Sequence, residues 1–91
     1  MAITVIIPDA LRPYAGLNER VPLEASTAAE ALTKLMERYP EIKARLPQDL
    51  ATLPPNMGIY RNSEDLRRLQ GLETPLREDD RLTIVVPEGS M

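Results

Sequence analysis

The sequence predicts an α+β fold, in which a mixed sheet of about four strands is covered by one main helix. Two apolar segments rich in β-branched residues stand near opposite ends of the chain, and one capped amphipathic stretch lies between them. The 91 residues are too few for two hydrophobic cores. We therefore expect one domain over residues 1–91, with residues 87–91 as a C-terminal tail.

The first two strands are predicted to form a hairpin. The first covers residues 3–7, a β-branched run whose odd-numbered residues share one face, while Thr4 and Ile6 share the other. A loop then leads to a weaker second strand over residues 19–25. Pro22 lies inside this second strand and is tolerated there only at a sheet edge or a bulge.

The helix signal is the strongest in the sequence. Thr27 is the expected N-cap, and Glu30 three residues later completes a capping box. Pro40 ends the helix and begins a second short turn that carries Ile42 and Leu46. The spacing of Glu30 and Lys34 predicts an i,i+4 ion pair. The predicted buried stripe of the helix consists of Ala28, Ala31, Leu32, Leu35, Met36 and Tyr39.

The second half of the chain predicts two further strands. Residues 47–56 are a proline-rich loop, residues 57–61 a short strand, residues 64–76 an irregular stretch and residues 82–86 the last strand. The first and last strands are the most continuously apolar, which suits the centre of a sheet, so we expect them to lie side by side there. A mixed sheet wrapped in this way over one helix is the β-grasp arrangement.

The composition argues against a self-contained enzyme. The chain has no Cys and no His, which removes thiolate nucleophiles, Cys-ligated metals and the commonest general base. The net charge of −3 argues against nucleic-acid partners. No apolar run approaches a membrane span and no signal peptide is evident, so we expect a cytoplasmic location. We expect no cofactor and no metal site, since the acidic run at residues 78–80 is typical of a solvated turn.

Several segments of the second half occur in a recognisable order. Residues 59–66 are an apolar strand with an Asn-led turn, residues 71–76 a Gly-x-x-Thr-Pro-Leu loop, and residues 80–82 the entry to the last strand. This order resembles the MoaD/ThiS family of ubiquitin-like sulfur-carrier proteins, over the whole chain as far as Pro87. The opening through residues 11–13 is similar to the long-loop carrier of bacterial cysteine synthesis.

The resemblance implies a carrier without catalytic residues of its own. Members of the family end in Gly-Gly, whose carboxylate is adenylated by an E1-like adenylyltransferase and converted to a thiocarboxylate. The sulfur then passes to a sulfur-accepting enzyme in cofactor or cysteine biosynthesis. Some relatives first lose a short C-terminal extension to a JAMM-type protease.

The tail departs from the family pattern. It reads Pro87-Glu88-Gly89-Ser90-Met91, so Gly89 is the one residue that can correspond to either glycine. Three interpretations stay open. The chain is processed after Gly89, or its native end was cut or altered, or it is a MoaD/ThiS-like non-covalent interaction module that has lost the carrier tail.

The sequence also predicts a partner-binding face on the sheet. Ile6, Tyr60 and Val85 have the parity opposite to the core, so central strand pairing would bring them into one apolar patch. We predict that Arg61 and Pro87 belong to the same face. The alternatives are scattered surface residues or a surface for self-association.

Overall fold

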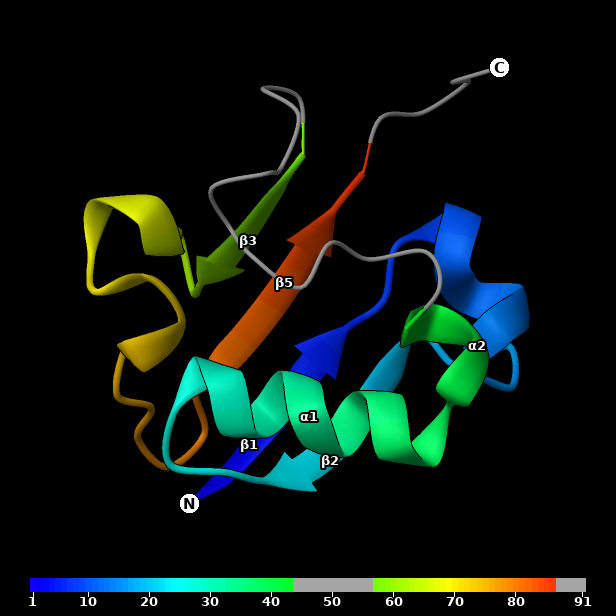
Figure 1. Ribbon diagram of the computed structural model, residues 1–91, viewed down its shortest axis with the longest axis horizontal. Coiled ribbons are helices and arrows are strands. Elements are labelled where there is room, and N and C mark those ends of the chain that lie inside the picture. The colour runs from blue at the N-terminus through cyan, green and yellow to red at the C-terminus, as the bar shows by residue number, and fades with distance from the viewer. Residues whose placement is uncertain (44–56, 87–91) are drawn as a thin grey trace.

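The computed structural model describes residues 1–43 and 57–86 and confirms the predicted fold class: a mixed sheet lies against one main helix (Figure 1). The strands are β1 (Ala2–Ile6), β2 (Arg20–Glu24), β3 (Gly58–Arg61), β4 (Glu64–Asp65) and β5 (Arg81–Val85). The α-helices are α1 (Ala28–Arg38) and α2 (Pro40–Lys43), and the 3-10 helices are η1 (Asp9–Ala15), η3 (Leu66–Arg68) and η4 (Gly71–Glu73).

The sheet has the order β2-β1-β5-β3-β4, with five strands where the sequence predicts about four. The additional strand, β4, has two residues, of which Asp65 opposes Tyr60. As predicted, β1 and β5 lie side by side in the centre. They run parallel, with Val5 opposite Leu82, whereas the other neighbouring pairs are antiparallel.

The core lies between the sheet and α1. Val5 and Leu82, at the centre of the two middle strands, are fully buried, as are Leu35 of α1 and Ile42 of α2. Aromatic rings are absent from this set of buried residues, so the core is aliphatic. Met36 and Met57 pack against it as partly buried residues, a position that suits the flexible methionine side chain, which fills irregular gaps in a core.

The hairpin of β1 and β2 forms as predicted, and its long connection folds as η1. Gly16 ends η1 with a left-handed φ of 64°, a conformation that glycine adopts without a side-chain penalty. Pro22 opposes Thr4 on β2, the edge strand of the sheet. Its missing N–H therefore removes no bond from a central strand pair.

Helix α1 begins with the predicted cap, because Glu30 N donates to Thr27 Oγ1 at 3.2 Å. The reciprocal bond reaches one residue further than expected: Glu30 Oε1 accepts from Ser26 N at 2.6 Å. The predicted ion pair of Glu30 with Lys34 is replaced by other contacts, since Lys34 Nζ donates to the carbonyl of Glu24. Pro40 begins α2 as predicted, and Ile42 of this helix is buried, while Leu46 lies outside the described residues.

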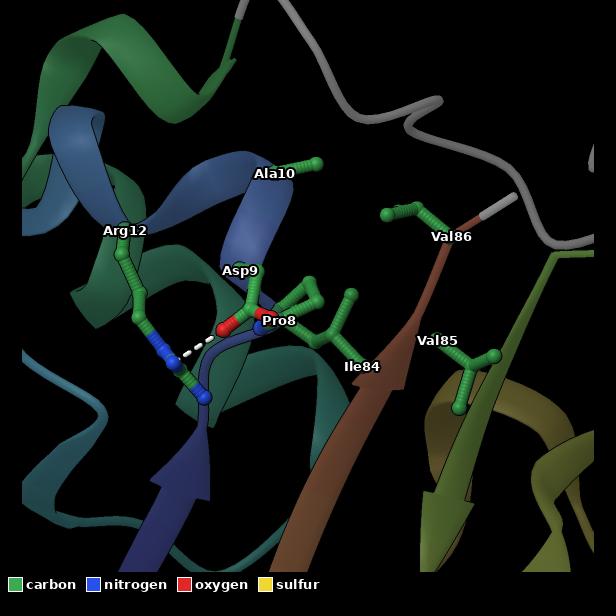
Figure 2. Close-up of a pocket in the computed structure, with 7 residues that line it drawn as sticks. All are labelled: Pro8, Asp9, Ala10, Arg12, Ile84, Val85 and Val86. Carbon is green, nitrogen blue, oxygen red and sulfur yellow. Dashed lines mark ion pairs between the residues drawn. The ribbon is translucent and has the colours of Figure 1, made fainter. Parts of the chain in front are cut away.

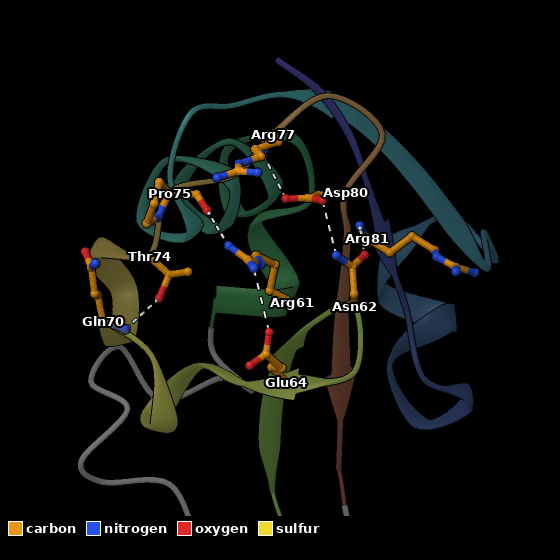
Figure 3. A network of polar contacts seen from close by, with 9 residues as sticks. All are labelled: Arg61, Asn62, Glu64, Gln70, Thr74, Pro75, Arg77, Asp80 and Arg81. Atoms are coloured by element: carbon orange, nitrogen blue, oxygen red, sulfur yellow. Dashed lines mark hydrogen bonds and ion pairs between the residues drawn. The ribbon is translucent and has the colours of Figure 1, made fainter.

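The turn before β5 is fastened to the turn after β3, the neighbouring strand of the sheet. Asn62 Nδ2 donates to Asp80 Oδ1 at 3.2 Å, and Asn62 Oδ1 accepts from Arg81 N at 3.1 Å. Asp80 Oδ2 accepts from Arg77 N at 2.8 Å (Figure 3). Asn62 and Asp79 both have positive φ, of 58° and 68°, which these residue types tolerate better than most.

Two sequence predictions concern residues beyond the described ranges. The loop predicted at residues 47–56 lies outside them, and so does the tail at residues 87–91. Within residues 1–43 and 57–86, no helix is long and apolar enough to cross a membrane.

Candidate functional site

The candidate site lies on the outer face of the sheet, the face turned away from α1. The strand register brings one row of side chains together across all five strands on this face. In order, the row is Arg20, Ile6, Thr83, Tyr60 and Asp65. The next row towards the end of β5 contains Val85 opposite Gly58.

The structure brings three of the predicted site residues to this face. Ile6 and Tyr60 are half-buried, and Val85 is 39% exposed. Thr83 lies between Ile6 and Tyr60, so the three apolar side chains surround a threonine instead of touching in a row. We call Ile6, Tyr60 and Val85 the apolar patch.

Arg61 does not lie on the outer face. It opposes Leu82, a core residue, and therefore points to the helix side of the sheet. Its guanidinium donates from Nη1 to the carbonyl of Pro75 at 3.3 Å, and Nη2 lies 3.7 Å from Glu64 Oε1 (Figure 3). Arg61 Nε is buried without a hydrogen-bond partner. These contacts tie β3 to the segment after η4, which is a structural role.

Gly58 and Tyr60 shape the middle of the outer face. A Cβ atom at Gly58 would lie 3.0 Å from Tyr60 Cε1 and 3.5 Å from Arg67 Nη2. The tyrosine ring and the guanidinium thus close over the backbone of β3, and Gly58 is buried although it is on the outer side. The absent side chain is what lets the ring lie close to the strand.

A well-formed ion pair borders the apolar patch at the β4 edge. Arg67 donates to both carboxylate oxygens of Asp65, from Nη2 at 2.9 Å and from Nε at 3.2 Å, and Asp65 Oδ1 also accepts from Arg67 N at 2.8 Å. These bonds hold the pKa of Asp65 below its ordinary value, although burial acts in the opposite direction. They also raise the pKa of Arg67.

A pocket of about 390 Å³ lies beside the end of β5, between this strand and the start of η1 (Figure 2). Its lining is Pro8, Asp9, Ala10, Arg12, Ile84, Val85 and Val86. Arg12 is fixed at its rim, because it pairs with Asp9 and with Glu19 and donates from Nε to the carbonyl of Ile7. Val85 is shared by this pocket and the apolar patch, so the two surfaces are continuous.

The other predicted site residues, Pro87 and Gly89, lie outside the described residues. Val86, the last described residue, lines the pocket at the end of β5. In residues 1–43 and 57–86, no group of three or more acidic, His or Cys side chains is placed to hold a metal ion.

Sequence reasoning missed several residues of the outer face. Strand parity could have identified Arg81, because it lies two residues before Thr83 on the same strand. Arg20 could have been identified in the same way, because it lies opposite Ile6 on the neighbouring strand. The same parity separates Arg61 from its neighbour Tyr60. The pairing of Asp65 with Arg67 depends on the two-residue strand β4, which no hydrophobic pattern marks.

Comparison with known proteins gives one family and several relatives. The model of the ThiS family matches residues 5–89. A curated protein of Mycobacterium tuberculosis, sulfur carrier protein CysO, is 34% identical over 87 residues, which cover 93% of this chain and 94% of the relative.

Solved structures are similar over almost the whole chain. One is in a crystal structure of the BexX/CysO complex of Amycolatopsis orientalis, with 34% identity, a TM-score of 0.82 and coverage of 99% of both chains. Another is the solution structure of small archaeal modifier protein 1 of Methanosarcina acetivorans, with 27% identity, a TM-score of 0.80, and coverage of 99% of this chain and 96% of that one.

Proposed function

The chain belongs to the ThiS family, and from this membership we propose that it is a ubiquitin-like sulfur-carrier protein of the cytoplasm that acts in cofactor or cysteine biosynthesis. The observation that carries the proposal is the extent of the family match, which runs from residue 5 to residue 89 and so includes Gly89. The relative from Mycobacterium tuberculosis, which is named a sulfur carrier, supports the same function.

The proposed chemistry takes place at the C-terminal carboxylate after processing behind Gly89. In an E1-like adenylyltransferase, a carboxylate oxygen attacks the α-phosphorus of ATP and pyrophosphate leaves. A hydrosulfide-equivalent donor then attacks the acyl carbon, AMP leaves, and a thiocarboxylate remains. The carrier supplies a handle and the terminal carboxyl, while the partner enzymes supply the acid–base and nucleophilic groups. A chain without Cys or His is suited to that division of labour.

A glycine at the activated end has a physical reason. The tail has to enter a narrow adenylation channel, where a side chain larger than hydrogen would collide with the walls, and glycine also adopts extended conformations freely. A processing protease of the JAMM type would remove Ser90 and Met91 to expose this end.

The apolar patch and the adjoining pocket are the proposed docking surface for the adenylyltransferase and for the sulfur-accepting enzyme. They lie around the end of β5, the strand from which the chain continues towards Gly89. A partner that holds Val85 and the pocket is therefore close to the start of the tail. CysO of Amycolatopsis orientalis is found in a complex with BexX, which supports a carrier that binds a protein partner.

The function is tested by the intact mass of the protein isolated from its own host, with the C-terminal peptide sequenced. We expect a chain that ends at Gly89 and a fraction in which one oxygen is replaced by sulfur. A protein that keeps Met91 in every molecule, with no sulfur-loaded form under sulfur demand, would contradict the proposal. That result would favour the non-covalent interaction module, which would use the same docking surface.

A further inference from the structure

An open hollow of about 450 Å³ lies on the outer face, on the side of Ile6 away from the β5 pocket. Its lining contains two arginines, Arg20 from β2 and Arg81 from β5, with Ile6 and Thr83 between them. Asn62 and Ser63, at the turn after β3, complete it. We call this the arginine hollow.

The two guanidinium groups of the arginine hollow find no partner within residues 1–43 and 57–86. Among the residues that the structure describes, Arg20 has no hydrogen-bond or ion-pair partner for its side chain, and Arg81 has none either. Both are exposed, and Arg81 extends away from the polar network that surrounds Asn62 (Figure 3). Arg12, Arg61 and Arg67 differ in this respect, since each has a carboxylate partner.

The carboxylates of the outer face are already neutralised. By strand parity this face contains Glu24 of β2 and Asp65 of β4. Glu24 pairs with the N-terminal ammonium at 3.3 Å, and Asp65 pairs with Arg67 at 2.9 Å. Among the strand residues of this face, the charge left uncompensated is therefore positive, although the whole chain has a net charge of −3. Asp80, in the turn before β5, accepts from Asn62 at the edge of the hollow and has no ion-pair partner among the described residues.

The backbones of the two arginines are far enough apart for each guanidinium to meet a carboxylate of its own. They lie two strands apart and two residues out of register, which places their Cα atoms about 12 Å from each other. A protein surface can match this spacing with two acidic side chains, and an apolar side chain between them would meet Ile6. A guanidinium binds a carboxylate through two parallel hydrogen bonds, which adds direction to the charge attraction.

We propose that the arginine hollow receives an acidic segment of the adenylyltransferase, with one carboxylate on Arg20, one on Arg81 and an apolar side chain over Ile6. This inference rests on the proposed carrier function and adds a second, electrostatic half to its docking surface. The apolar patch then contributes buried area next to the tail, while the hollow guides the encounter and fixes the orientation of the complex.

The test measures the KM of the carrier in ATP–pyrophosphate exchange by the adenylyltransferase of the same organism, with carrier produced in its own host. We expect Arg20→Gln and Arg81→Gln each to raise this KM about threefold, and the double variant about tenfold, at about 0.05 M NaCl. The increase should largely vanish at about 0.5 M NaCl, because salt screens exposed charges. Arg81→Lys, which keeps the charge but not the two parallel hydrogen bonds, should raise the KM less than Arg81→Gln does at low salt.

Lys43→Gln is the matched control, because it removes the same charge from an exposed residue of α2. The inference would be overturned if the KM stayed unchanged in the double variant, or if Lys43→Gln raised the KM as much as the single arginine variants do. Either result would leave the carrier function standing. If the wild-type carrier supports no exchange at all, the proposed function fails and the inference fails with it. Thermal unfolding of each variant verifies that the fold is retained.

Discussion

Gly58 shows how one missing side chain shapes the outer face. The ring of Tyr60 lies so close to this residue that a Cβ atom would be 3.0 Å from Cε1. The contact is with the end of a side chain and not with backbone, so the ring can yield. The position of Tyr60, and with it the form of the apolar patch, therefore depends on a residue that contributes no side chain of its own.

We predict that Gly58→Ala displaces the Tyr60 ring with little change in stability. The cost of moving the ring is partly offset by the better strand propensity of alanine, so the free energy of unfolding should change by less than about 1 kcal/mol. The NMR signals of the Tyr60 ring should shift clearly. Gly16→Ala is the contrasting variant: its φ of 64° makes alanine strained there, so it should destabilise by about 1 kcal/mol while the Tyr60 signals stay in place. Unshifted ring signals in Gly58→Ala would contradict the prediction.

The pair of Asp65 and Arg67 predicts a dependence of stability on pH. Because the pKa of Asp65 is lowered in the folded protein, its ionised form stabilises the fold above the unfolded value of about 4. This contribution is lost as the pH falls through the lower pKa of the folded state. Urea unfolding should show Asp65→Asn to be less stable than the wild type at about pH 7, with a smaller difference at about pH 2. An equal difference at both pH values would show that the charge has no part in it.

At the scale of elements, the N-cap of α1 makes a contribution to the free energy of unfolding that can be measured by itself. Thr27 Oγ1 accepts from Glu30 N, so Thr27→Ala leaves one of the first helical N–H groups without its partner. We expect a loss of about 1 kcal/mol in the free energy of unfolding, measured by urea titration. Thr27→Ser keeps the hydroxyl and should lose much less. A similar loss in both variants would assign the effect to the methyl group of threonine instead of the cap.

Elements with their own local signal were predicted from the sequence, and those held by distant contacts were not. The capping box, the apolar stripe and the two β-branched strands have complete local patterns, and Pro22 even indicated the edge position of β2. Strand β4 consists of two residues and exists through its pairing with β3, so it has no periodicity to detect. The spacing of Glu30 and Lys34 was correct for a pair, but nearby backbone groups of Ser26 and Glu24 compete for both side chains.

The candidate site was only partly predicted, because some of its features are local and others depend on distant contacts. Ile6, Tyr60 and Val85 share the outer face because strand parity is a local property. Arg61 was grouped with them by its proximity along the chain, which parity contradicts. The unpaired state of Arg20 and Arg81 depends on which charges other strands bring near, and that information is available only once the sheet order is known.

At the scale of the whole molecule, stability depends on the central strand pair, because no disulfide supplements the core. Leu82 is fully buried in β5, while Val85 of the same strand is 39% exposed. Leu82→Ala should lower the free energy of unfolding by about 2–5 kcal/mol, and Val85→Ala by less than about 1 kcal/mol, in urea titrations. If the two variants lost equal stability, the division of β5 into a core side and an outer side would be wrong.

Because β1 and β5 pair in parallel, the resistance of the molecule to a pulling force also depends on the direction of that force. The described chain starts at one end of β1 and leaves β5 at the opposite end (Figure 1). A force that pulls these two ends apart acts along both strands, so it loads the hydrogen bonds between them together in shear and cannot open them one by one. An enzyme that draws on the tail while the other end is held would thus pull the carrier along its most resistant axis.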